Sequence, residues 1–219
     1  MTGKVRVSSY AVSIDGFGAG PRQSLENPLG VGGEQLHHWF YPTDTFRTQF
    51  IGERGETGVD EGFASRSMAN VGAWILGRNM FAHSRGPWPD DDPWKGWWGD
   101  EPPYHCDVFV LTHHPRASIA MRGGTVFHFV TDGPGEALRR ARKAAGDRDV
   151  RIGGGAATIR QYLRAGDIDE MHVAVSPVLL GAGEPLWQGL DLPALGYEVA
   201  ESTAGERATH LRITRKDIG

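Results

Sequence analysis

The chain has 219 residues, with 23 Lys and Arg against 27 Asp and Glu, and a single cysteine, Cys106. This length fits one domain with a substantial core, and the net charge of −4 offers no basic surplus for binding nucleic acid. One cysteine excludes an internal disulfide and a cysteine-based zinc cage, so we expect a protein of the reducing cytoplasm.

The first predicted element is a strand over residues 4–14. Apolar or small residues alternate there with more polar ones from Val5 to Ala11, and the Asp-Gly pair at 15–16 predicts a turn. The apolar stretches are short and broken by charged and hydroxyl side chains. We therefore expect neither a signal peptide nor a membrane span here.

A long glycine-rich segment follows, at about residues 17–60. We expect it to be a loop insertion, with a short helix over residues 33–41. Asp60 is predicted to cap the N-terminus of a helix over residues 61–72. The apolar run at residues 73–77 then predicts a buried strand.

A second loop insertion is predicted at about residues 85–104. It carries four of the seven tryptophans, Trp88, Trp94, Trp97 and Trp98. A loop of this length in a compact domain is usually functional, and aromatic residues concentrate at interfaces. The loop is predicted to be a substrate lid or a dimer contact.

Beyond this loop, strands and helices alternate along the chain. Strands are predicted over residues 107–112, 125–131, 150–154 and 171–180, and helices over residues 133–146 and 156–166. Pro134 suits a helix start and Gly166 a helix end. Two alternating segments, 197–203 and 209–215, predict a hairpin. The fold class we predict is α/β, with a mixed, mainly parallel sheet, helices on both faces and an antiparallel C-terminal hairpin.

The glycines at 153–155 join a predicted strand to a predicted helix. Free amides and the positive end of a helix dipole would suit a phosphate there. No lysine follows to make the ATP-binding phosphate loop, and Thr158 stands where the usual dinucleotide fingerprint needs a third glycine. From this segment alone, a tight packing turn is as good an interpretation as a phosphate site.

Four segments, in order, resemble one known family. They are YAVSIDG at 10–16, ILGRNM at 75–80, VLTHHPR at 110–116 and the long segment VRIGGG through EPLW at 150–187. Together they resemble the dihydrofolate-reductase-like superfamily, and specifically the C-terminal reductase domain of the bifunctional riboflavin-biosynthesis enzymes and its stand-alone relatives. The resemblance covers nearly all of residues 1–219 as one domain, apart from the two loop insertions. It implies a dihydrofolate-reductase-like fold, NADPH as cofactor and often a homodimer.

The resemblance also implies a set of cofactor-binding residues. Gly77 and Arg78 would open a helix beneath the phosphates, and Thr112, His113 and Arg116 would lie near the ribose and its 2′-phosphate. The glycines at 153–155 would carry the pyrophosphate, and Ala11 would lie against the nicotinamide. The full set is Ala11, Gly77, Arg78, Asn79, Thr112, His113, Arg116, Gly153, Gly154, Gly155, Ala156 and Thr158.

The residues of the substrate end are less determined. Asp15 is a candidate proton source or, equally, the turn former that an Asp-Gly pair often is. Ser13 and Glu184 are candidates for contacts to the substrate. Dihydrofolate reductases carry a carboxylate on their first long helix, and Asp60 or Glu61 is the corresponding guess here. No metal is expected, because adjacent histidines on extended backbone point to opposite sides and no ligand cluster is present.

We therefore expect an NADPH-dependent reductase of a small heterocyclic or ribosyl-type substrate, pterin-like or ribosylaminopyrimidine-like. It would resemble 5-amino-6-(5-phosphoribosylamino)uracil reductase or dihydrofolate reductase, with no nucleic-acid or membrane partner. A zinc deaminase half is not expected, since one cysteine cannot supply its ligands. The alternative is a non-catalytic nucleotide-binding sensor or partner-binding dimer that kept the fold. A flavin-dependent enzyme fits the glycine and Gly-Arg motifs less well.

Overall fold

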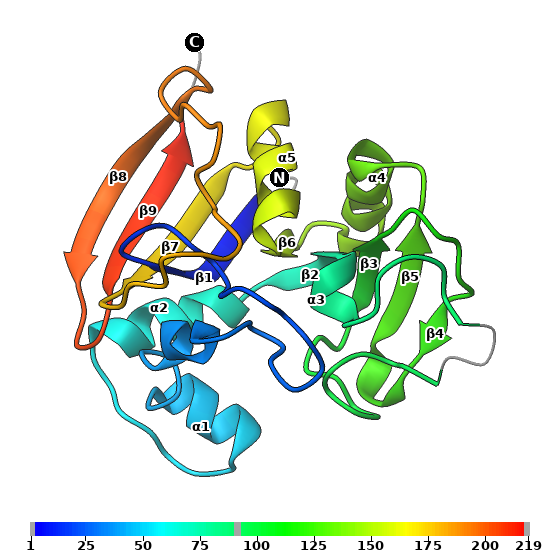
Figure 1. The fold of residues 1–219 in the computed structure, drawn as a ribbon, viewed down its shortest axis with the longest axis horizontal. Helices are drawn as coiled ribbons and strands as arrows, with labels where there is room; N and C mark the ends of the chain where they lie inside the picture. Colours follow the sequence, from blue (N-terminus) through cyan, green and yellow to red (C-terminus); the bar gives the residue numbers. More distant parts are fainter. Residues whose placement is uncertain (1–2, 90–92, 217–219) are drawn as a thin grey trace.

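The computed structural model describes residues 3–89 and 93–216, and one twisted sheet runs through this part of the chain (Figure 1). The strand order is β4-β5-β3-β2-β6-β1-β7-β9-β8. The strands are β1 (Val5–Ser13), β2 (Val71–Gly77), β3 (Asp107–Leu111), β4 (Ile119–Ala120), β5 (Val126–Val130), β6 (Asp149–Gly154), β7 (Glu170–Ser176), β8 (Tyr197–Ala204) and β9 (Thr209–Arg215). All pairs from β5 through β7 are parallel, whereas β4, β9 and β8 pair antiparallel. The predicted fold class is confirmed.

Helices cover both faces of the sheet (Figure 1). The helices are α1 (Asp44–Phe50), α2 (Val59–Met68), α3 (Arg78–Phe81), α4 (Pro134–Ala145) and α5 (Ala156–Ala165), with 3-10 turns η1 (Gly33–His37) and η2 (Arg122–Gly124). The amphipathic helices α4 and α5 bury their apolar sides against the central strands in the main core. On the opposite face, Ala64 of α2 and Trp39 form a smaller core with Ala174 of β7 and with Ala208, the residue before β9.

Several local signals act as predicted. Pro134 begins α4, and Gly166, with φ 69, ends α5 in the left-handed conformation that favours glycine. The central strand β2 is buried over Gly72–Gly77, as expected for a strand covered on both faces. Within the described residues, no helix is both long and apolar enough to cross a membrane.

Four predictions about elements are wrong. Asp60 is not the N-cap of its helix, because α2 begins at Val59 after Gly58 and the Glu206 carboxylate accepts the amides of Val59 and Asp60. The insertion at 17–60 contains helix α1, capped by Thr43, whose Oγ1 accepts the amide of Phe46. The helix at 33–41 is only the 3-10 turn η1. The strand expected to reach residue 180 ends at Ser176, just before Pro177.

The alternation predicted for the first strand also fails beyond Val7. The pairing register of β1 with β7 shifts between Val7 and Tyr10, and Ser9 has a φ of 53. Beyond this bulge, residues 11–13 are all buried. One extra residue therefore changes which side chains of β1 face each side of the sheet.

Candidate functional site

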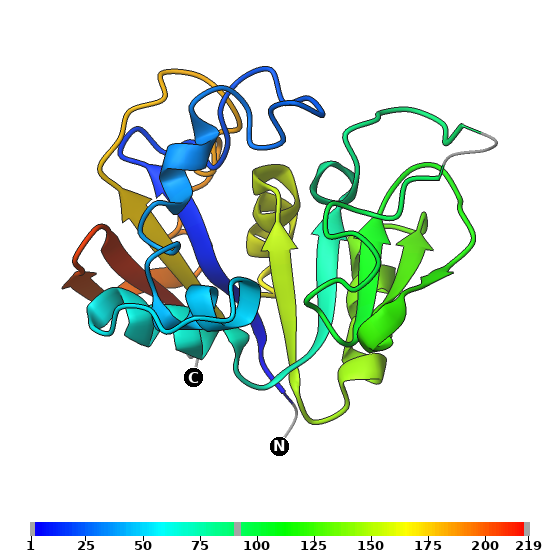
Figure 2. The ribbon, with the colours of Figure 1, turned by 90° about the horizontal axis from the view of Figure 1, so that it is seen from below.

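The carboxyl ends of β3, β2, β6 and β1 lie side by side at one edge of the sheet, here called the carboxyl edge (Figure 2). They lie together because these four strands are adjacent and parallel. The residues expected to bind the cofactor all lie near the carboxyl ends of these strands or in the segments that follow them. In α/β proteins, ligands commonly bind at this edge.

The glycines of β2 and β6 allow two turns to approach each other closely. A Cβ built on Gly77 would collide with Thr158 Oγ1 of α5 and would lie 3.4 Å from the Gly154 carbonyl oxygen. Gly154 has a φ of 120, and its Cβ would lie 2.9 Å from the Tyr10 ring. By contrast, a Cβ on Gly155 would meet no atom within 4 Å. The start of α5 is therefore open beside Gly155, which itself has no side chain to cap the helix, and the Tyr10 hydroxyl lies near the next amide, that of Ala156.

Arg78 and Thr112 meet beside this turn. Arg78 Nη1 lies 3.4 Å from Thr112 Oγ1, and Nη2 lies 3.3 Å from Ser84 Oγ. The guanidinium also stacks on Trp88, with its carbon 3.0 Å from the ring centroid. Arg116 approaches the same ring at 4.5 Å, so both predicted arginines contact one indole.

Two predicted cofactor residues are less involved in contacts. His113 and Asn79 are exposed, the first after β3 and the second in α3. Asn79 and His83 help to line a cavity of about 20 Å³, together with Trp97 of the loop at 85–104.

The described part of the loop at 85–104 contacts its own chain extensively. Trp88 Nε1 donates to the His114 carbonyl, and Trp94 Nε1 donates to the Phe81 carbonyl. Trp98 is exposed and stacks on Phe50 of α1, with centroids 5.2 Å apart. These contacts hold the described part of the loop against its own chain, while the Trp98 ring stays exposed. The prediction for this loop also includes residues 90–92, which lie outside the described residues.

The predicted substrate-end residues meet at the end of β1. Ser13 Oγ accepts the Phe17 amide at 3.0 Å, and the Asp15 carboxylate accepts the amides of Leu180 and Gly181 at 3.1 and 2.7 Å. Hydrogen bonding from Ser13 and then from these two amides lowers the pKa of Asp15. The backbone of Glu184 pairs with residues 18 and 19. Asp15 therefore holds two loops together as an ionised turn former.

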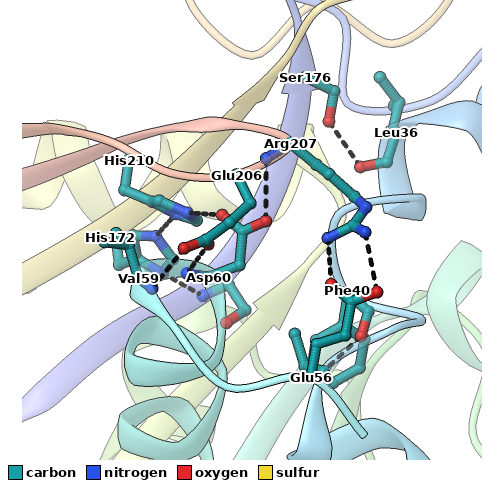
Figure 3. A network of polar contacts seen from close by, with 12 residues as sticks. Leu36, Phe40, Glu56, Val59, Asp60, His172, Ser176, Glu206, Arg207 and His210 are labelled. Atoms are coloured by element: carbon teal, nitrogen blue, oxygen red, sulfur yellow. Dashed lines mark hydrogen bonds and ion pairs between the residues drawn. The ribbon is translucent and has the colours of Figure 1, made fainter.

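The two carboxylates offered for the first long helix are both occupied by other contacts. Asp60 is buried and accepts from His210 and from the Arg207 amide (Figure 3). Glu61 accepts the amide and the hydroxyl of Thr45. Neither carboxylate is placed to donate a proton at the carboxyl edge.

Tyr10 is a further candidate site residue that the sequence did not reveal. Its ring lies against Gly154 and its hydroxyl against Gly18, in contact with the glycine turn. Burial, with a smaller contribution from Glu184, raises the pKa of this phenol, so the hydroxyl stays protonated. The alternation assumed for β1 concealed it, because the bulge at Ser9 could not be seen in the sequence.

Among residues 3–89 and 93–216, no group of three or more His, Cys, Asp or Glu side chains is arranged to hold a metal ion. Cys106 is a buried free thiol whose pKa burial raises to about 11. The chemistry available at the carboxyl edge comes from backbone amides, guanidinium groups, hydroxyls and carboxylates.

Comparison with known proteins gives a consistent result. The family model described as the RibD C-terminal domain matches residues 5–211. The uncharacterised protein YyaP of Bacillus subtilis (strain 168) is 34% identical over 92 residues, which are 40% of this chain and 48% of YyaP. The matched segment thus spans about half the length of that curated relative.

Solved structures share the fold. A candidate riboflavin biosynthesis protein of Shewanella sp. PV-4 has a TM-score of 0.55 and 23% identity, covering 99% of both chains. A diaminohydroxyphosphoribosylaminopyrimidine deaminase/5-amino-6-(5-phosphoribosylamino)uracil reductase of Thermotoga maritima has a TM-score of 0.53 and 12% identity, covering 97% of this chain and 57% of that one. RibD of Acinetobacter baumannii has a TM-score of 0.52 and 18% identity, covering 98% and 58%.

Proposed function

Because the chain belongs to the RibD C-terminal domain family, we propose that it is an NADPH-dependent reductase of a small heterocyclic or ribosyl-type substrate. Family membership supports a reductase-type function. The observation that carries the proposal is the meeting of Gly77, Gly154 and Thr158 at the carboxyl edge, beside Arg78 and Thr112. A side chain at Gly77 or Gly154 would collide with the atoms that meet there.

The residues present fit a dinucleotide phosphate. The open N-terminus of α5 at Gly155 suits the pyrophosphate, with the Thr158 hydroxyl beside it. Arg78 and Arg116 offer charge for the 2′-phosphate, near Thr112 and His113. When bound, NADPH supplies a hydride from its nicotinamide ring. The protein's part is to orient that ring and exclude water, and the small side chain of Ala11 would leave room for the ring.

The substrate end is built around Ser13, Asp15 and Glu184. We keep Ser13 and Glu184 as candidate substrate contacts. Because the pKa of Asp15 is lowered and two backbone amides bind its carboxylate, the geometry favours an anchoring role over proton donation. Tyr10 holds its proton on the phenol oxygen against the glycine turn.

We further propose that the protein acts as a homodimer in the cytoplasm. Light scattering after size exclusion would test the dimer. A mass of one chain at working concentration would contradict it.

Turnover tests the proposed activity. NADPH oxidation should be followed with a panel of pterins and ribosylaminopyrimidines, using Gly77→Ala as the variant with an obstructed carboxyl edge. Oxidation that depends on one substrate, and that the variant loses, is the expected result. Tight NADPH binding without turnover across the panel would instead favour the sensor.

A further inference from the structure

A buried chain of three side chains links α2, β9 and β7 on the face of the sheet that α2 covers (Figure 3). His210 Nε2 lies 2.7 Å from Asp60 Oδ1, and His210 Nδ1 lies 2.9 Å from His172 Nε2. Asp60, His172 and His210 are 3%, 7% and 0% exposed. Buried titratable groups need defined partners, and here each has them.

The hydrogen bond at the His172 end of this series determines which nitrogen of each imidazole carries the proton. The Ser9 amide lies 3.0 Å from His172 Nδ1, and an amide can only donate, so that nitrogen is an acceptor. His172 must then donate from Nε2 to His210 Nδ1, and His210 from Nε2 to Asp60. The other oxygen of Asp60 accepts the Arg207 amide at 3.0 Å. Both imidazoles are therefore neutral, each in one tautomer.

Aromatic packing holds the two imidazoles in place. Phe63 of α2 stacks on both rings, with centroids 4.2 Å from His210 and 4.6 Å from His172. Trp39 meets both edge-on. The nearby cations Arg66 and Arg151 further disfavour a charge on His172, whose pKa is lowered to about 3, mainly by burial.

The amide that His172 accepts belongs to the bulge of β1. Ser9 adopts the left-handed conformation where the register of β1 with β7 shifts. His172 lies on β7 itself, so its imidazole takes an amide beside the interrupted ladder. After the bulge, Tyr10 pairs with Val173 and Ala11 with Ala174.

This register decides which side of the sheet each residue of β1 faces. A slip of one residue would exchange the faces of Tyr10 and Ala11. Tyr10 would then leave the glycine turn, and Ala11 would lose the position proposed beside the nicotinamide. Loss of the acceptor for this partly buried amide would weaken the bulge that sets the register.

We propose that Asp60, His210 and His172 form a positioning chain that holds the β1 bulge and so places Tyr10 and Ala11 at the carboxyl edge. The effect on cofactor binding rests on the proposed function. The three residues act through Ser9, and none of them is among the residues proposed to contact cofactor or substrate.

Two variants with side chains of nearly equal shape test the role of His172 Nδ1 as the acceptor for the Ser9 amide. His172→Asn keeps an oxygen close to the position of Nδ1, whereas His172→Leu removes it, and both break the link to His210. In the full chain without cofactor, the Ser9 amide should stay protected from hydrogen exchange in His172→Asn and lose protection in His172→Leu. The amide signals of Tyr10 and Ala11 should move in His172→Leu. NADPH should bind roughly tenfold more weakly to His172→Leu than to His172→Asn.

Equal exchange at Ser9 in the two variants would overturn the proposal, whatever NADPH does. If wild-type protein binds no NADPH, the proposed function fails, and exchange at Ser9 still decides the positioning role. Should His172→Leu not fold, ¹⁵N spectra of the wild-type imidazoles decide. Nδ1 is expected to be unprotonated in both His172 and His210. A proton on His172 Nδ1 would overturn the proposal.

Discussion

At the scale of single residues, Gly77 is where a small change tests the site most sharply. Its φ of −73 is open to any residue, so its need for glycine comes from space alone. The obstruction is the Thr158 hydroxyl, on the first turn of α5. Gly77 thus permits the close approach of β2 and α5 on which the proposed phosphate site depends.

Gly77→Ala should therefore lower the free energy of unfolding by about 1–3 kcal/mol through overpacking, and weaken NADPH binding. Gly135→Ala is the matched control, because a Cβ at this helical position meets no atom within 4 Å. Denaturant unfolding and cofactor titration measure both effects. Thr158→Ala in the Gly77→Ala background should restore stability by removing the obstructing hydroxyl. Equal stability of the Gly77→Ala and Gly135→Ala variants would contradict this packing argument.

Asp15 gives a second prediction at this scale. Asp15→Asn replaces one acceptor oxygen by a donor, so the amides of Leu180 and Gly181 lose part of their partner. Turnover should fall while NADPH affinity is kept, and these two amides should exchange faster. Unchanged turnover would remove Asp15 from the reaction, and unchanged exchange would remove it as an anchor.

At the scale of elements, local signals predicted most helices and strands, and long-range contacts explain the errors. Pro134, Gly166 and the alternating C-terminal segments are local signals, and each acts as expected. The start of α2 depends on Glu206, which is far along the chain, so the sequence around Asp60 indicated the wrong cap. The bulge at Ser9 depends on His172, which reaches β1 only after folding.

The buried histidines give a prediction about pH at this scale. The pKa of His172 falls from 6.5 to about 3 on folding, so between these values the unfolded chain binds a proton that the native chain does not. Stability should therefore fall as the pH drops through this range. His37, whose pKa burial lowers to about 4, adds to the same trend.

Unfolding measured against pH should show a shallower slope in His172→Asn, by about one proton. His83→Gln is the control, because His83 is exposed in the folded chain. An unchanged slope in His172→Asn would contradict a neutral buried His172.

At the scale of the whole molecule, the order of strands brings scattered motifs together at the carboxyl edge. Gly77, Thr112 and Gly154 are distant in sequence, and the adjacency of β3, β2 and β6 brings their strand ends together. The motifs and their resemblance allowed this convergence to be predicted. The position of Tyr10 and the hydrogen bond that the Asp60 carboxylate accepts from His210 could not be predicted, because both depend on residues that come together only in the folded sheet.

The proposed function requires the carboxyl edge to bind NADPH and to contact its 2′-phosphate. Tryptophan fluorescence should report binding directly, because the Trp88 ring is in contact with both Arg78 and Arg116. Titration of wild-type protein should give tighter binding of NADPH than of NADH by roughly tenfold or more, the size of one charge-assisted contact. Arg78→Gln should narrow that difference. Equal affinities for the two nucleotides would contradict the phosphate contact, and binding of neither would contradict the proposed function.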